Sequence, residues 1–224
     1  MIRLLQLLGF ALLTFNMACA EEETPPPETD GEQRVIEEGR DFSRVLPVQP
    51  TSVAPGQVEV LEFFWYGCPH CYRAEAAIEQ WRENLPEGVV FRRIPATLSR
   101  GWVTMSQAYY TAEVLGVLEN MHPAFFAAFH ENGTMLASED QLAAYFKEHA
   151  GVEEAAFREA FNSIQVSSRV QRADALSRRY RIGGVPAMTV NGKYITNPEM
   201  ARGYEKMVDT VELLARWELK AQDD

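Results

Sequence analysis

A short apolar segment that runs directly into two closely spaced cysteines constrains the fold of this 224-residue chain more than any other feature. Residues 58–64 read VEVLEFF, which has the length and composition of a buried β-strand. The tetrapeptide CPHC follows at residues 68–71, and from Tyr72 the apolar residues recur every three or four positions, as in a helix. The order strand, cysteine pair, helix predicts an α/β fold in which both sulfurs lie at a helix N-terminus.

The two sulfurs have different environments in such an arrangement. A helix N-terminus carries partial positive charge and unpaired N–H groups, which stabilise a thiolate on Cys68 and lower its pKa. Cys71 lies one turn further into the helix, less exposed and close enough to form a disulfide with Cys68. Pro69 suits the first helical position, and His70 supplies a hydrogen-bond donor or a positive charge beside the thiolate. We therefore predict that Cys68 is the reactive sulfur and Cys71 the resolving one.

Other uses of the cysteines are less favoured. The three cysteines of the chain, at positions 19, 68 and 71, are too few for a disulfide scaffold. A C-x-x-C pair is also half of a zinc site, but structural zinc usually takes four ligands, and the sequence has no second C-x-x-C and no close H-x-x-x-H. A purely structural disulfide at this spacing would be a small, strained ring. The pattern favours redox chemistry by the cysteines alone, with no metal ion and no cofactor.

The N-terminus is typical of an exported protein. Residues 1–20 resemble a secretory signal, because a positive charge precedes an apolar run at residues 4–15 that is too short for a comfortable transmembrane helix. Residues 18–20 fit a cleavage site after Ala20. Acylation of Cys19, as in a bacterial lipoprotein, is the alternative, although no leucine stands three positions before it. Either outcome places the protein outside the cytoplasm, where disulfides form.

Charge and composition bound the partners. Residues 21–38 are predicted to be disordered, because charged residues and prolines dominate the start of this segment. The net charge of -11 argues against nucleic acid and anionic membrane surfaces as partners. The hydrophobic fraction of 46% is enough for a sizeable core in the remainder.

A helical stretch separates two β-rich parts. Residues 89–94 are predicted as a second strand, and helical spacing dominates from residue 101 to residue 168. Within that stretch, Ser138 and Gln141 form a capping-box pattern, and the dipeptide His122-Pro123 indicates a helix start.

The C-terminal part has its own turn and helix signals. The dipeptide Asn191-Gly192 between two β-prone runs predicts a hairpin. An amphipathic helix is predicted over about residues 203–219.

Two segments resemble the DsbA family of dithiol oxidases. They are FFWYGCPHCYRAE at residues 63–75 and GGVPAMTVNGKY at residues 183–194, and the similarity extends over most of the chain from about residue 33. The resemblance implies a thioredoxin fold with an inserted all-helical domain. It also implies a cis peptide bond between Val185 and Pro186, in a loop that pairs with the substrate chain.

The sequence patterns and the resemblance together give the expected domains, partners and location. The expected divisions are a signal at 1–20, the disordered segment at 21–38, a thioredoxin part at 39–100, a helical insertion at 101–168 and a second thioredoxin part at 169–224. The expected activity is that of a monomeric periplasmic oxidase, which transfers the Cys68–Cys71 disulfide to exported proteins with free cysteines. A membrane partner of the DsbB kind would reoxidise the pair.

Several residues outside the CPHC tetrapeptide are candidates for supporting roles. Glu62 lies in the apolar strand, where family members have an acid that aids proton transfer; the alternative is a glutamate that faces solvent at a strand edge. Trp65 and Tyr66 are expected to contribute to an apolar substrate surface or to pack against the inserted helices. The histidines of the helical stretch, His122, His130 and His149, are predicted to be surface or capping residues.

Two other functions compete with the oxidase. A disulfide isomerase or reductase is one, but periplasmic isomerases of the thioredoxin superfamily typically carry an N-terminal dimerisation domain, and only about 25 residues separate the expected signal from the expected fold. A chaperone that binds peptides without redox turnover is the other, and it would not need both sulfurs.

Overall fold

The structure is a computed structural model that describes residues 34–223. The predictions for the signal, for Cys19 and for the segment up to residue 33 lie outside the described residues. Within the described residues, no helix is long and apolar enough to cross a membrane.

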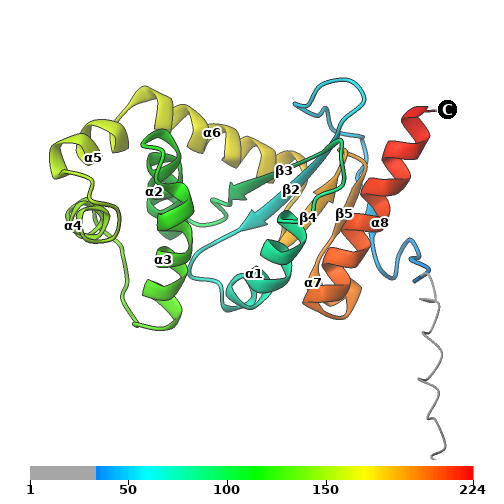
Figure 1. Cartoon of the computed structure of the whole chain (residues 1–224), viewed down its shortest axis with the longest axis horizontal. Coiled ribbons are helices and arrows are strands. Elements are labelled where there is room, and N and C mark those ends of the chain that lie inside the picture. Colours follow the sequence, from blue (N-terminus) through cyan, green and yellow to red (C-terminus); the bar gives the residue numbers. More distant parts are fainter. Residues whose placement is uncertain (1–33, 224) are drawn as a thin grey trace, which may run out of the picture. The chain divides into compact units, whose positions relative to one another are not determined.

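A five-stranded mixed sheet forms the centre of the fold (Figure 1). The strands are β1 (Ser43–Arg44), β2 (Val58–Phe64), β3 (Val89–Pro95), β4 (Ala187–Val190) and β5 (Tyr194–Thr196), in the order β1-β5-β4-β2-β3. Strand β2 pairs in parallel with β3 and antiparallel with β4. Strands β4 and β5 pair antiparallel with each other.

Both faces of β2 are covered, which explains its continuous apolar sequence. All seven residues of β2 are buried. Val58 and Val60 pack with helices α1 (Pro69–Arg82) and α8 (Tyr204–Asp223), while Leu61 and Phe63 belong to a second core cluster with the helical segment. A strand buried on both faces loses the polar–apolar alternation of a half-exposed strand.

Between β3 and β4 the chain is helical. A 3₁₀ turn (Arg100–Trp102) leads into α2 (Val103–Val114), α3 (Leu118–His130), α4 (Glu139–Ala150), α5 (Glu154–Phe161) and α6 (Ile164–Arg179). Figure 1 shows α2 to α5 grouped beside the sheet, with α6 leading back toward it. The expected fold class, a thioredoxin fold with a helical insertion, is confirmed. The expected boundary at residue 168 lies inside α6, because this one helix packs against both α2 and β3.

Local signals placed most of these elements. The capping box of Ser138 and Gln141 is present at the start of α4, and Gly151 ends that helix in the left-handed conformation. Asn191 and Gly192 have φ values of 50° and 68°, as expected of a tight hairpin turn between β4 and β5. A last short helix, α7 (Pro198–Ala201), precedes α8.

The predicted start of α3 at His122-Pro123 is wrong. The helix begins at Leu118, so Pro123 lies inside it. Proline has no N–H to donate to the carbonyl four residues earlier, here that of Glu119 in the first turn. Burial of Phe125 and Phe126 on the inner face of α3 offsets the loss of this one hydrogen bond.

Candidate active site

The CPHC tetrapeptide lies where β2 passes into α1. Strand β2 ends at Phe64, Cys68 occupies the N-cap position, and Pro69 is the first residue of the helix. The Cys68 N–H donates to the Trp65 carbonyl at 3.0 Å, which closes a turn between strand and helix. Because proline fixes φ at a helical value and has no N–H to leave unpaired, Pro69 is well suited to this start.

The two cysteines are free thiols with opposite acidities. The side chain of Cys71 is buried, and Cys68 is 8% exposed. The pKa of Cys68 is lowered to about 6, first by the hydrogen bond from the Cys71 thiol and then by the backbone N–H groups of Cys71 and His70. Burial and the neighbouring Cys68 sulfur raise the pKa of Cys71. Cys68 is therefore the more acidic thiol of the pair, and Cys71 keeps its proton.

A second loop brings a cis proline close to Cys68. The Val185–Pro186 peptide bond is cis, as the family resemblance implied. The Val185 carbonyl oxygen lies 3.3 Å from Cys68 Sγ. Beside this loop is a groove of about 830 Å³, whose lining includes Gly183, Gly184 and Tyr204.

His70 is exposed and has partners on its own helix and on α8. Its Nδ1 accepts a hydrogen bond from Arg73 Nη2 at 2.9 Å and lies 3.0 Å from the Tyr204 hydroxyl. Arg73 Nε donates to the same hydroxyl at 3.0 Å. The three side chains hold one another at the edge of the groove.

Glu62 lies in the interior, and the alternative of a solvent-facing strand-edge glutamate is wrong. Its side chain is fully buried, and its carboxylate accepts from Arg93 Nε of the neighbouring strand β3 at 3.0 Å. Burial raises the pKa of Glu62 to about 8, against the opposing effect of Arg93. When it is ionised, Glu62 in turn raises the pKa of Cys71, so the two groups are within electrostatic reach.

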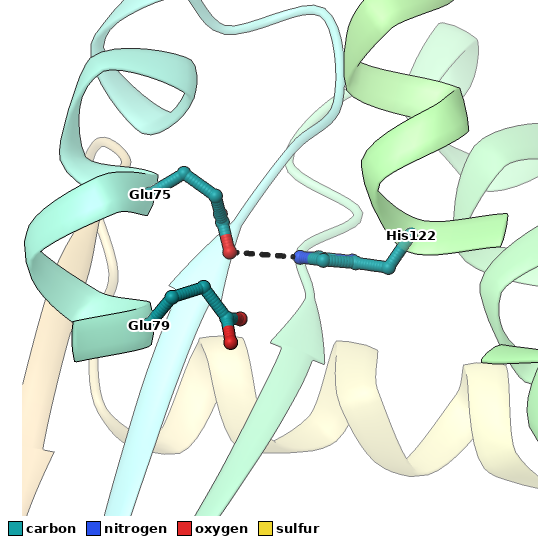
Figure 2. Close-up of side chains that lie close together, drawn as sticks. All are labelled: Glu75, Glu79 and His122. Carbon is teal, nitrogen blue, oxygen red and sulfur yellow. Dashed lines mark hydrogen bonds and ion pairs between the residues drawn. The ribbon is translucent and has the colours of Figure 1, made fainter. Parts of the chain in front are cut away.

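Arg93 connects Glu62 to a second group of titratable residues. Its Nη2 donates to both Glu75 and Glu79 of α1, and Glu75 Oε1 also lies 3.1 Å from His122 Nε2 of α3 (Figure 2). Glu75, Glu79 and His122 are close enough to one another to serve as metal ligands. The guanidinium of Arg93 already supplies the positive charge among these oxygens, so the donor set does not fit a further cation.

The surroundings of Trp65 and Tyr66 differ from each other. Tyr66 is 1% exposed and its ring packs 5.0 Å from the rings of Phe125 and Phe126, so it belongs to the core rather than to a substrate surface. Trp65 is half-buried and stacks on Trp102 at 4.5 Å. Tyr66 was expected either to contribute to a substrate surface or to pack against the inserted helices, and it packs against the helices.

One of the three histidine predictions, that for His122, is wrong. His122 is buried, and its Nδ1 lies 2.8 Å from the Tyr66 hydroxyl. His130 is partly buried, and its Nε2 donates to the Tyr66 carbonyl at 2.8 Å. His149 is exposed, as predicted.

A signal for the buried histidine was present in the sequence. His122 precedes Phe125 and Phe126 by three and four positions and therefore shares their apolar helix face. Arg93 was also missed, and its role depends on the register between β2 and β3, which places it opposite Glu62.

Comparisons with known proteins agree with this fold. The family model of the DSBA-like thioredoxin domain matches residues 59–214. The thiol:disulfide interchange protein DsbA of Azotobacter vinelandii is 40% identical over 84% of this chain and 86% of its own length. The DsbA of Pseudomonas aeruginosa strain PAO1 is 36% identical over 82% of this chain and 86% of its own length. A crystal structure of Pseudomonas aeruginosa DsbA superimposes with a TM-score of 0.78 and 35% identity, over 83% of this chain and 96% of that one.

Proposed function

This chain belongs to the DSBA-like thioredoxin domain family and is a thiol:disulfide oxidoreductase, and on that premise we propose that it oxidises dithiols in exported proteins, with Cys68 as the attacked sulfur. The observation that carries the proposal is the contrast between the two thiols. A pKa of about 6 for Cys68 stabilises the reduced form as a thiolate at neutral pH. A disulfide whose reduced product is stabilised is readily passed on to a substrate.

The reaction has two exchange steps. A substrate thiolate attacks Cys68 Sγ of the oxidised protein, the Cys68–Cys71 bond breaks, and the electron pair goes to Cys71, which takes up a proton. A second substrate thiolate then attacks the substrate sulfur of the mixed disulfide. Cys68 leaves as a thiolate, the substrate leaves with a disulfide, and the protein is reduced by two electrons.

The neighbouring residues have separate parts in these steps. Glu62, protonated below about pH 8, supplies the proton that Cys71 takes up. Pro69 begins the helix whose N–H groups stabilise Cys68, and His70 contributes its own backbone N–H. The backbone around Val185 and Pro186 aligns the substrate chain next to Cys68, and Trp65 forms part of the surface beside it.

Location and partners extend the same proposal. The chain would act in the periplasm, after removal of residues 1–20 or as a lipoprotein anchored at Cys19. Its substrates would be exported proteins that still have free cysteines. A membrane protein of the DsbB kind would reoxidise the Cys68–Cys71 pair, and the working form would be a monomer.

The proposal is tested by the equilibrium of the cysteine pair with glutathione and by turnover of a peptide with two cysteines. We expect a reduction potential near the oxidising end of the superfamily, on the order of -120 mV, and a Cys68→Ser variant without activity. A potential near -270 mV, as in thioredoxins, would replace the oxidase with a reductase.

Two further assays separate the competing functions. The chain would be an isomerase if it restored the native disulfides of a scrambled substrate protein faster than it oxidised the thiols of a reduced one. Peptide binding and chaperone activity that survive in Cys68→Ser would show a binding protein without redox turnover.

A further inference from the structure

His122 joins three elements of the fold through its two ring nitrogens. It is 6% exposed in α3, its Nδ1 lies 2.8 Å from the hydroxyl of Tyr66 in the loop before Cys68, and its Nε2 lies 3.1 Å from Glu75 Oε1 of α1. Figure 2 shows the imidazole of His122 directed at Glu75 across the space between the two helices. A histidine with both nitrogens engaged has a fixed ring orientation.

The direction of both hydrogen bonds follows from the partners. Glu75 Oε1 already accepts from Arg93 Nη2, so a proton on Glu75 would have to lie on the other oxygen. Oε1 is therefore an acceptor for His122, and Nε2 carries the hydrogen. Nδ1 must then accept, which makes the Tyr66 hydroxyl its donor.

The imidazole stays neutral in this place. Burial holds the pKa of His122 well below its ordinary value, and Arg93 adds to the effect. The ring is enclosed by the rings of Phe64, Tyr109 and Phe126, with centroids 5.4, 6.3 and 5.2 Å away. The ring itself therefore stays uncharged over the physiological pH range and does not act as a pH switch.

Tyr66 is held from α3 at both its ends. His122 Nδ1 accepts a hydrogen bond from the Tyr66 hydroxyl, and His130 Nε2 donates to the Tyr66 carbonyl oxygen at 2.8 Å. The Trp65 carbonyl accepts the N–H of Cys68, so Tyr66 lies inside the turn that places the reactive sulfur. A shift of Tyr66 would move Cys68 relative to the N–H groups of His70 and Cys71 that stabilise its thiolate.

We propose that His122 is a positioning residue for Cys68, which fixes Tyr66 and through it the distance between the reactive sulfur and the N–H donors at the start of α1. The helical segment would thereby set the redox equilibrium of the cysteine pair, without any contact between His122 and sulfur. The inference rests on the proposed role of Cys68. If the wild-type chain fails to oxidise peptides, the proposed function fails, but the redox equilibrium of the pair can still be measured.

The experiment compares Tyr66→Phe, which removes only the hydroxyl, with His122→Phe. We expect each variant to lower the equilibrium constant for oxidation of glutathione by about threefold to tenfold, or roughly 15–30 mV. We also expect the thiolate absorbance of Cys68 to titrate at higher pH than in the wild type. The double variant should show no larger shift than the stronger single one, because both substitutions break the same hydrogen bond.

A matched control separates positioning from simple loss of stability. Tyr145→Phe removes a hydroxyl that donates to the Ala124 carbonyl of α3 at 2.7 Å, and it leaves the bond between Tyr66 and His122 in place. This variant should lose stability and keep the wild-type equilibrium. The inference is overturned if Tyr66→Phe unfolds more easily but keeps the wild-type equilibrium and thiolate titration, and Tyr66→Phe alone gives this answer if His122→Phe does not fold.

Discussion

Glu62 combines full burial with a titration close to physiological pH. Its pKa is raised from its ordinary value of 4.5 to about 8, because burial outweighs the attraction of Arg93. Between these two values the unfolded chain has released the proton and the folded chain still holds it. The unfolded state therefore binds fewer protons, and the contribution of Glu62 lowers the free energy of unfolding as pH rises from about 4.5 to 8.

Replacing Glu62 with glutamine should remove this fall in the free energy of unfolding at high pH. We expect Glu62→Gln to be more stable than the wild type by roughly 2–4 kcal/mol at pH 8, with little difference at pH 4, in urea unfolding at several pH values. Arg93 would keep its bonds to Glu75 and Glu79. The same variant should lose any inflection near pH 8 in the rate of peptide oxidation.

A control glutamate lies on the surface of α8. Glu212 forms an i,i+4 pair with Arg216 and is partly exposed, so Glu212→Gln should leave both pH profiles as in the wild type. Identical pH profiles for the wild type and Glu62→Gln would contradict the proton-donor role of Glu62.

Among the elements, α4 offers a clean test of local stability. The Ser138 hydroxyl accepts from the Gln141 N–H at 3.3 Å, and the Gln141 side chain accepts from the Ser138 N–H at 3.1 Å. We expect Ser138→Ala to cost about 1 kcal/mol, or about 2–4 °C in Tm, because the helix start loses this acceptor. Thermal unfolding measures the shift, and the reduction potential should stay unchanged because α4 lies away from Cys68.

A second serine gives the comparison. Ser99 occupies the N-cap of the 3₁₀ turn without a side-chain cap bond. Ser99→Ala should therefore change Tm by much less than Ser138→Ala. Equal losses for the two variants would show that the capping bond contributes nothing measurable.

The elements that were predicted from sequence are those with local signals. The buried strand β2, the cap of α4 and the hairpin at Asn191 each depend on residues within a few positions of one another. The start of α3 was misplaced because proline is common at a first turn, whereas the burial of the Phe125 face depends on packing with distant segments.

The candidate site shows the same division between local and distant contacts. Cys68, Cys71 and the cis proline were identified from two short segments. The pairs Arg93–Glu62 and His122–Tyr66 were missed because their members are 31 and 56 residues apart in the chain. Contacts at such separations depend on strand register and helix packing, which no short motif encodes.

Over the whole molecule, the acidity of Cys68 links the redox state to the stability of the fold. In the reduced protein, the pKa of Cys68 is about 6 when folded, against an ordinary value of 9.0. A depressed pKa of an acidic group stabilises the folded state above the ordinary value, and this stabilisation is lost as pH falls through the folded value. In the oxidised protein neither sulfur titrates, so this contribution is absent.

The Tm of the reduced form minus that of the oxidised form should therefore rise with pH from about 6 to 8.5. Above this range Cys71, whose pKa is raised in the folded chain, acts in the opposite direction. One proton gives at most about 1.4 kcal/mol per pH unit, which is roughly 3–6 °C in Tm for a chain of this size. Taking the difference between the two forms removes the shared contribution of Glu62, whose sign is opposite. Calorimetry of both forms at pH 5, 7 and 8.5 measures this difference in Tm. A Cys68→Ser/Cys71→Ser variant shows how Tm changes with pH when neither thiol is present. A difference that stays constant from pH 5 to 8.5 would mean that the fold does not stabilise the Cys68 thiolate, and the driving force proposed for oxidation would then have to come from strain in the disulfide form.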